Sequence, residues 1–270
     1  MSTKKIVNYS PNFDSKKRNS KQIKFLIFHY TGMKKDFNYS PNFDHNKRNS
    51  KQIKFLIFHY TGMRKESDAI KRLTNIQSEV SSHYLIKKNG DIVVMVPDLY
   101  IAWHAGKSSW KNFKSLNKNS IGIEISNPGH EHNYLNFSKK QFQSILYLSK
   151  SLKKKYKIKS SNVLGHSDIA PFRKKDPGEK FPWKNLAKLG VGKWHSLSNK
   201  ILKKNRMKKI NVNEEKNFFK FLFEIGYSKK VLNKKILVSA FQRKFRQELT
   251  NGKIDQECLL ISQNLAKKLS

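Results

Sequence analysis

The chain has 270 residues, of which 37% are hydrophobic and 12% aromatic, a composition that excludes disorder throughout. Its 56 lysine and arginine residues against 19 aspartate and glutamate residues give a net charge of +37, which attracts polyanions such as nucleic acid, anionic lipid or an acidic cell-wall polymer. Its one cysteine, Cys258, excludes an internal disulfide and a metal site made of several cysteines, so that a metal would need histidine and carboxylate ligands.

A thirty-residue segment occurs twice, at 8–37 and at 38–67, with differences at only five positions. Each copy has a turn-rich start, SPNFD, followed by IKFLIFHY, whose β-branched, aromatic and aliphatic residues predict a strand. After the second copy, residues 66–77 predict a helix capped by Ser67. Only a turn follows the first copy, so we interpret residues 1–37 as a surplus duplicate.

The following segments alternate between strand and helix patterns. Residues 81–97 predict a hairpin with its turn at Asn89–Gly90, and residues 119–126 predict a buried strand. An amphipathic helix is predicted to open at Ser138, and a short strand near 163 leads into a loop. This order predicts an α/β domain over residues 38–196, with a central mixed β-sheet flanked by helices.

The remaining chain has a different pattern. Residues 197–212 are basic and polar without a clear core pattern, and we interpret them as a linker. Three helical segments follow, with turns at Gly226 and Gly252 and with Asp255 as the cap of the last helix. Residues 213–270 therefore predict a small three-helix domain, in which Cys258 is a buried helix residue.

Three features could carry chemistry: His59 at the end of a strand, Glu124 inside NSIGIEIS, and GHSDIAPFRKKDPG with His166 and Asp176. Two histidines and one carboxylate suit a zinc ion with an open position for water. A carboxylate in an apolar strand is costly to bury unless it is paired or functional, and a salt bridge from Glu124 to a lysine is the alternative. Spacing alone leaves both interpretations open, because the prolines and glycine of the loop could simply shape a turn.

Five segments in order, FHYTG, VSSHYLI, IAWHAG, NSIGIEISNPG and GHSDIAPFRKKDPG, resemble the signature of a known family. They are similar to those of the zinc-dependent N-acetylmuramoyl-L-alanine amidases of type 2, which are related to peptidoglycan recognition proteins and phage endolysins. The resemblance covers about Asn38 to Trp194. The last sixty residues resemble the three-helix peptidoglycan-binding domain that often follows such amidases, although a plain helical cap is the alternative.

The resemblance implies one zinc ion with His59, His166 and Asp176 as ligands and Glu124 as the catalytic glutamate. The family's basic residue two positions before the aspartate falls on Lys174. The expected reaction is hydrolysis of the amide bond between the lactyl group of N-acetylmuramic acid and L-alanine, in cell-wall turnover or recycling. Glu124 would carry the proton to the leaving amine, and Lys174 would stabilise the oxyanion.

The histidines outside the implied ligand set have other expected roles. We expect His104, beside Trp103, to line the substrate cleft, and His83 to be a packed residue. We expect His130, His132 and His195 to be solvated. His29, the counterpart of His59 in the first copy, would place thirty extra residues between the metal-bearing strand and its helix, so we choose His59. Either strand could nevertheless occupy the same position in the sheet.

Two further hypotheses come from other classes of protein. One is a non-catalytic peptidoglycan-binding protein. The other is a nucleic-acid-binding protein, suggested by the net charge, but no module that reads nucleic acid is apparent, so we expect none to bind. We expect a monomer that binds peptidoglycan or muropeptides and has no membrane span. The start of the sequence has no secretion signal, which predicts a cytoplasmic protein, with the periplasm or cell envelope as the alternative.

Overall fold

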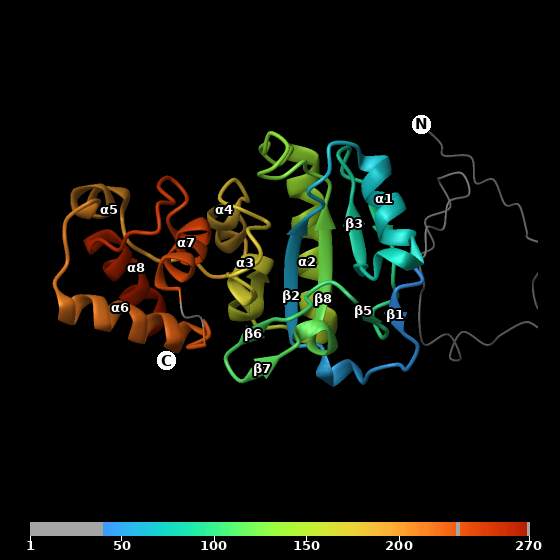
Figure 1. Ribbon diagram of the computed structural model, residues 1–270, viewed down its shortest axis with the longest axis horizontal. Helices are drawn as coiled ribbons and strands as arrows, with labels where there is room; N and C mark the ends of the chain where they lie inside the picture. The colour runs from blue at the N-terminus through green and yellow to red at the C-terminus, as the bar shows by residue number, and fades with distance from the viewer. Residues whose placement is uncertain (1–39, 231–232, 269–270) are drawn as a thin grey trace, which may run out of the picture. The chain divides into compact units, whose positions relative to one another are not determined.

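The structure is a computed structural model that describes residues 40–230 and 233–268 (Figure 1). The surplus duplicate predicted at 1–37, with His29, lies outside the described residues. The second copy enters the description at Ser40 and supplies the first strand of the central sheet. Among the described residues, none of the helices combines the length and the apolar composition that a bilayer crossing requires.

The central sheet has five strands in the order β4-β3-β8-β2-β9. Four of them run parallel to their neighbours, and β4 pairs antiparallel with β3. The strands are β2 (Phe55–Tyr60), β3 (Tyr84–Ile86), β4 (Ile92–Val94), β8 (Ser120–Ile125) and β9 (Val163–Gly165). The predicted mixed sheet is therefore confirmed, and so is the hairpin at Asn89–Gly90, where Gly90 adopts a φ of 92° that an L side chain rarely tolerates.

Shorter elements surround the sheet. Two small antiparallel pairs join β1 (Phe43–Asp44) with β5 (Ile101–Ala102), and β6 (Ser109–Trp110) with β7 (Phe113–Lys114). Single 3-10 turns are η2 (Ser50–Gln52), η3 (Ile76–Ser78), η4 (Leu116–Asn119) and η5 (Ser160–Asn162).

The helices of the first part of the chain are α1 (Glu66–Thr74), α2 (Lys139–Tyr156), α3 (His166–Ile169) and α4 (Trp183–Lys188). Ser138 caps α2 as predicted, in a reciprocal box with Gln141. Ser67 does not cap α1: the helix begins one residue earlier, and the Ser67 hydroxyl contacts the carboxylate of Asp68 instead. The loop predicted after β9 begins with α3, a single turn closed by the Asp168 side chain on the backbone of Gly165.

The two faces of the sheet differ in chemistry because side chains alternate along a strand. Leu56 and Phe58 of β2 and the three isoleucines of β8 pack against α2, which covers this face (Figure 1). Phe55 and Ile57 lie on the opposite face, in a second core cluster that includes residues of the C-terminal helices. His59 and Glu124 follow the same alternation and therefore lie on that second face.

The C-terminal region contains the three predicted helices, α6 (Val212–Ile225), α7 (Lys234–Phe245) and α8 (Gln256–Lys267), with Asp255 as the predicted cap of α8. Cys258 is buried in α8, as predicted. The range predicted as a linker differs, because it contains α5 (Asn199–Asn205). This short helix depends on its cap, Ser198, and on the burial of Leu202 in the second core cluster. Leu202 is the one buried residue of α5, so the sequence shows no apolar stripe there.

A buried ion pair joins α3 to the C-terminal helices. Asp168 accepts hydrogen bonds from Lys244 Nζ at 2.7 Å, from the Tyr227 hydroxyl at 2.8 Å and from the Gly165 amide at 2.8 Å. The side chains of Lys244 and Asp168 are 5% and 1% exposed. Removing one member of such a pair leaves an uncompensated charge in the protein interior.

We therefore predict that Lys244→Met lowers the free energy of unfolding by about 3–5 kcal/mol, because it leaves the Asp168 carboxylate without its cation. The matched control is Lys234→Met, which removes an ion pair to Glu215 whose side chains are 69% and 41% exposed. This control should cost no more than about 1 kcal/mol. Urea denaturation followed by circular dichroism measures both, and equal losses would contradict the role assigned to Lys244.

Candidate active site

The predicted site residues lie at the carboxyl ends of three neighbouring parallel strands. His59 in β2 is paired in register with Glu124 in β8, so both side chains leave the same face of the sheet. His166 is the first residue after β9, which pairs with the other edge of β2. The fourth site residue, Asp176, lies in the loop after α3. The Ser167 amide donates to the Asp176 backbone carbonyl at 2.8 Å and so holds this loop against α3. Open parallel sheets commonly place ligands at this end of their strands.

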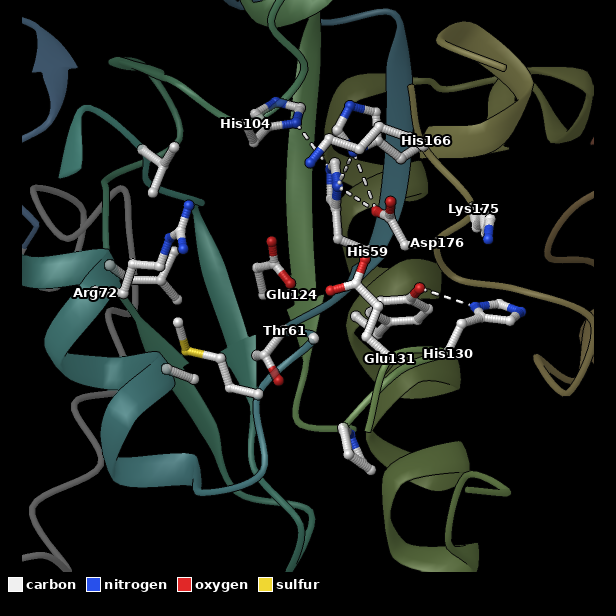
Figure 2. A pocket seen from close by; sticks show the side chains of 18 of the residues that line it. His59, Thr61, Arg72, His104, Glu124, His130, Glu131, His166, Lys175 and Asp176 are labelled. Carbon is white, nitrogen blue, oxygen red and sulfur yellow. Dashed lines mark hydrogen bonds and ion pairs between the residues drawn. The ribbon is translucent and has the colours of Figure 1, made fainter. Parts of the chain in front are cut away.

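Three electron-pair donors converge at this point (Figure 2). His59 Nδ1 lies 2.9 Å from His166 Nδ1 and 3.0 Å from Asp176 Oδ2, and His166 Nδ1 lies 3.1 Å from the same oxygen. All three side chains are buried. In the described part of the chain, these three form the group of histidine and carboxylate atoms close enough to hold a metal ion. The structure thus brings together the three predicted ligands.

The protonation of this cluster favours a cation. Burial and the neighbouring His166 lower the pKa of His59 to about 4, so its ring is neutral at physiological pH. Burial alone would raise the pKa of Asp176, but the contacts with both histidines hold it well below its usual range. The His166 Nε2 lies 3.2 Å from the Ala105 carbonyl, which can only accept a hydrogen bond, and 3.3 Å from Arg173 Nη2, which can only donate one, so these two contacts alone do not fix the tautomer of this ring.

These residues fit zinc. Two imidazole nitrogens and one carboxylate oxygen are a common set of three protein ligands for a zinc ion with an open position. Zinc lies about 2.0–2.1 Å from such atoms, so two ligand atoms on one tetrahedral ion are roughly 3.3 Å apart. The separations of 2.9–3.1 Å in the cluster are close to that value.

Glu124 has the properties of a group held for chemistry. Its Oε2 atom is shielded from solvent and has no hydrogen-bond partner among the described residues, which does not fit the alternative of a salt bridge to a lysine. Burial and the charge of Asp176 raise the pKa of Glu124 to about 8, against the opposing charges of Lys174 and Arg72. A carboxyl group with a pKa near neutrality can both take and give a proton.

Lys174 faces the same site. Its charge lowers the pKa of both Glu124 and His59, although it is not the largest cause for either. The neighbouring Arg173 is engaged elsewhere, because its Nε donates to the Lys107 carbonyl at 3.1 Å and its Nη2 to the Ala105 carbonyl. Of the three consecutive basic residues, Lys174 is thus the one that the sequence motif indicates and the electrostatics support.

A cavity of about 340 Å³ opens over the cluster. Trp103 and His104 line it, as predicted. The Trp103 indole donates to Asp44 at 2.8 Å, whereas His104 is largely buried and reaches the His59 ring on the side away from Asp176 (Figure 2). The cavity is also lined by residues to which the sequence analysis gave no role at the site, among them Arg72 of α1, Tyr60 and Thr61 of the FHYTG segment, His130 and Glu131.

Two histidines predicted to be solvated are not. His130 lies in the cavity wall, where its ring nitrogens are 2.9 Å from the Tyr60 hydroxyl and 3.0 Å from Glu179. His195 is buried, and burial lowers its pKa to about 4. Both partners of His130 are distant in sequence, so no local pattern could have indicated them. His83 is a buried packed residue, as predicted, 2.9 Å from the Arg48 guanidinium.

Comparison with known proteins agrees with this geometry. The family model described as N-acetylmuramoyl-L-alanine amidase, Amidase_2, matches residues 19–179. The N-acetylmuramoyl-L-alanine amidase AmiD of Escherichia coli is 35% identical over 212 residues, which cover 72% of this chain and 76% of that protein.

Two solved structures share the fold. One is the complex of Escherichia coli AmiD with the substrate anhydro-N-acetylmuramic acid-L-Ala-D-gamma-Glu-L-Lys, with a TM-score of 0.72, 34% identity, and coverage of 80% of this chain and 90% of that one. The other is AmpDh3 from Pseudomonas aeruginosa, with a TM-score of 0.70, 28% identity, and coverage of 90% and 99%. The resemblance inferred from five sequence segments is confirmed: this chain belongs to the Amidase_2 family of N-acetylmuramoyl-L-alanine amidases.

Proposed function

We propose that this protein hydrolyses the amide bond between the lactyl group of N-acetylmuramic acid and L-alanine, in peptidoglycan or in muropeptides released from it, with one zinc ion as cofactor. The observation that carries the proposal is the convergence of His59 Nδ1, His166 Nδ1 and Asp176 Oδ2 beside an unpartnered Glu124 carboxylate. Membership in the amidase family indicates which bond is cleaved, and the AmiD complex with an anhydromuramyl peptide supports the substrate class.

His59, His166 and Asp176 would hold the zinc ion. When bound, zinc polarises a carbonyl group and lowers the pKa of a coordinated water molecule to about 7. Glu124 would accept a proton from the attacking water and deliver it to the leaving amine of L-alanine. Its pKa of about 8 in the metal-free protein would fall near a divalent cation, toward a form that accepts protons. The Lys174 ammonium would stabilise the negative charge that develops on the carbonyl oxygen.

The cavity suits a sugar attached to an acidic peptide. Trp103 offers an aromatic surface for the sugar or the lactyl group, and Arg72, Lys174 and Lys175 place cations around the opening for the carboxylates of the stem peptide. The same chain supplies all three ligands, the glutamate and the lysine, so a monomer would suffice for catalysis. The C-terminal helices would add contacts to the wall polymer, which raises the concentration of substrate at the site.

The first test separates catalysis from metal binding. We predict that Glu124→Gln lowers the rate of stem-peptide release by about 10²–10⁴-fold, because the proton carrier is lost, while zinc content stays at one ion per chain. Mass spectrometry of incubated muropeptides and metal analysis measure the two quantities. Glu215→Gln, at an exposed position on α6, is the control and should keep full activity. Unchanged release by Glu124→Gln would contradict the role of Glu124.

A second test addresses the metal and the duplicated segment. We predict that the full chain and a chain lacking residues 1–37 both release stem peptide, from soluble muropeptides or from intact sacculi, and that a zinc chelator abolishes release by both. Added zinc should restore it. Release by the full chain alone would reopen the choice between His29 and His59. If neither chain releases stem peptide, with or without added zinc, but both still bind sacculi, the hypothesis of a non-catalytic peptidoglycan-binding protein would be favoured.

A further inference from the structure

A line of buried hydrogen bonds runs from His59 away from the cluster. His59 Nε2 lies 3.0 Å from His104 Nδ1, and His104 Nε2 lies 3.0 Å from the Ser120 hydroxyl oxygen. The Ser120 hydroxyl also lies 2.7 Å from the Leu116 backbone carbonyl. His59, His104, Ser120 and Leu116 are all buried, so water does not compete for these contacts.

The carbonyl at the end of the line fixes its direction. The Leu116 oxygen can only accept a hydrogen bond, so the Ser120 hydroxyl donates its proton there. Ser120 must then accept from His104, which places the His104 proton on Nε2 and leaves Nδ1 bare. A bare His104 Nδ1 accepts from His59 Nε2–H. The remaining nitrogen of His59, Nδ1, therefore carries a free lone pair, and this is the atom that faces His166 and Asp176.

We propose that His104 is a positioning residue that, through Ser120 and the Leu116 carbonyl, fixes the tautomer and orientation of His59 for zinc. The inference rests on the proposed zinc site. His59 needs this relay of hydrogen bonds because its Nε2 faces the His104 side chain rather than a backbone carbonyl. Groups behind metal-binding histidines commonly act in this way.

The surroundings of His104 hold its ring in place. An added Cβ at Gly122 of β8 would lie 2.4 Å from His104 Cγ, so only glycine leaves room for the ring there. The backbone amides of His104 and Ala105 both donate to the Asn117 side chain, at 3.2 and 2.7 Å. The His59 and His104 rings meet edge-on, at 83°, as an N–H directed at a ring nitrogen allows.

Breaking the relay at Ser120 has a defined consequence. Without the hydroxyl, the His104 Nε2–H has no hydrogen-bond acceptor, so the tautomer of His104 with its proton on Nδ1 becomes more favourable. That proton would oppose the His59 Nε2–H, so His59 would move its own proton to Nδ1, the position that zinc requires bare. The expected result is weaker zinc binding in a protein that is otherwise folded.

The experiment measures the zinc dissociation constant by competition with a fluorescent chelator. Ser120→Ala should raise it about 10- to 100-fold. Ser149→Ala is the matched control: Ser149 is also fully buried, and its hydroxyl has no partner among the described residues, so the constant should stay within about twofold of the original.

A second pair separates hydrogen bonding from packing. Leucine and asparagine have nearly the same shape, but the asparagine Oδ1 can replace His104 Nδ1 as an acceptor. His104→Leu should raise the zinc dissociation constant about 10- to 100-fold, and His104→Asn should restore it to within a few-fold of the original. Equal losses in both variants, or no loss in Ser120→Ala and His104→Leu, would overturn the inference.

Nuclear magnetic resonance gives a readout that does not depend on activity. In the zinc-loaded protein labelled with ¹⁵N at histidine, one ring proton should couple to nitrogens of two different rings, across the His59–His104 hydrogen bond, and His104→Leu should abolish that coupling. If the zinc-loaded original chain does not show this coupling, the relay is contradicted. Failure of the original chain to bind zinc at all would instead overturn the proposed function, and this inference with it.

Discussion

The close approach of three electron-pair donors is the constraint on which the rest of this structure depends. His59 Nδ1, His166 Nδ1 and Asp176 Oδ2 lie 2.9–3.1 Å apart in a buried site, where the carboxylate loses its hydration. A bound cation would offset this penalty, so metal binding at this point would be thermodynamically coupled to folding. Until a cation binds, the fold itself must hold the three atoms together.

Each of the three proposed ligands is held by a different part of the fold. His59 lies in β2, which is paired on both edges, and Asp176 is tied to α3 through the Ser167 amide. His166 begins α3, and that single turn is anchored by Asp168. The Asp168 carboxylate accepts hydrogen bonds from Lys244 and Tyr227 of the C-terminal region. A module attached only by a flexible linker would not supply these two side chains. The C-terminal helices therefore help to position His166, a proposed metal ligand, whatever they bind in addition.

Local patterns were sufficient to predict the central strands and the main helices, because apolar periodicity is a property of contiguous residues. The predicted ligand set rests instead on the order of five motifs and their resemblance to a family, because spacing alone left the metal site open. The exceptions depend on single contacts or on tertiary register: α5 on the burial of Leu202, and the His130 contacts on residues far along the chain. The repeat was the hardest case, since the strand residues of both copies are identical. The helix after β2 distinguishes the two copies, because α1 begins at Glu66, shortly beyond the HYTG of the second copy.

Strand β8 shows how one short segment can serve both stability and chemistry. Its isoleucines at 121, 123 and 125 pack against α2 on one face. On the other face, Ser120 ends the relay from His59, Gly122 leaves space for the His104 ring, and Glu124 lies beside His59 in the register. Because side chains alternate along a strand, substitutions on the second face can change the site without touching the apolar core. The same alternation explains why an apolar sequence such as NSIGIEIS can carry a carboxylate: Glu124 occupies a position that the core does not need.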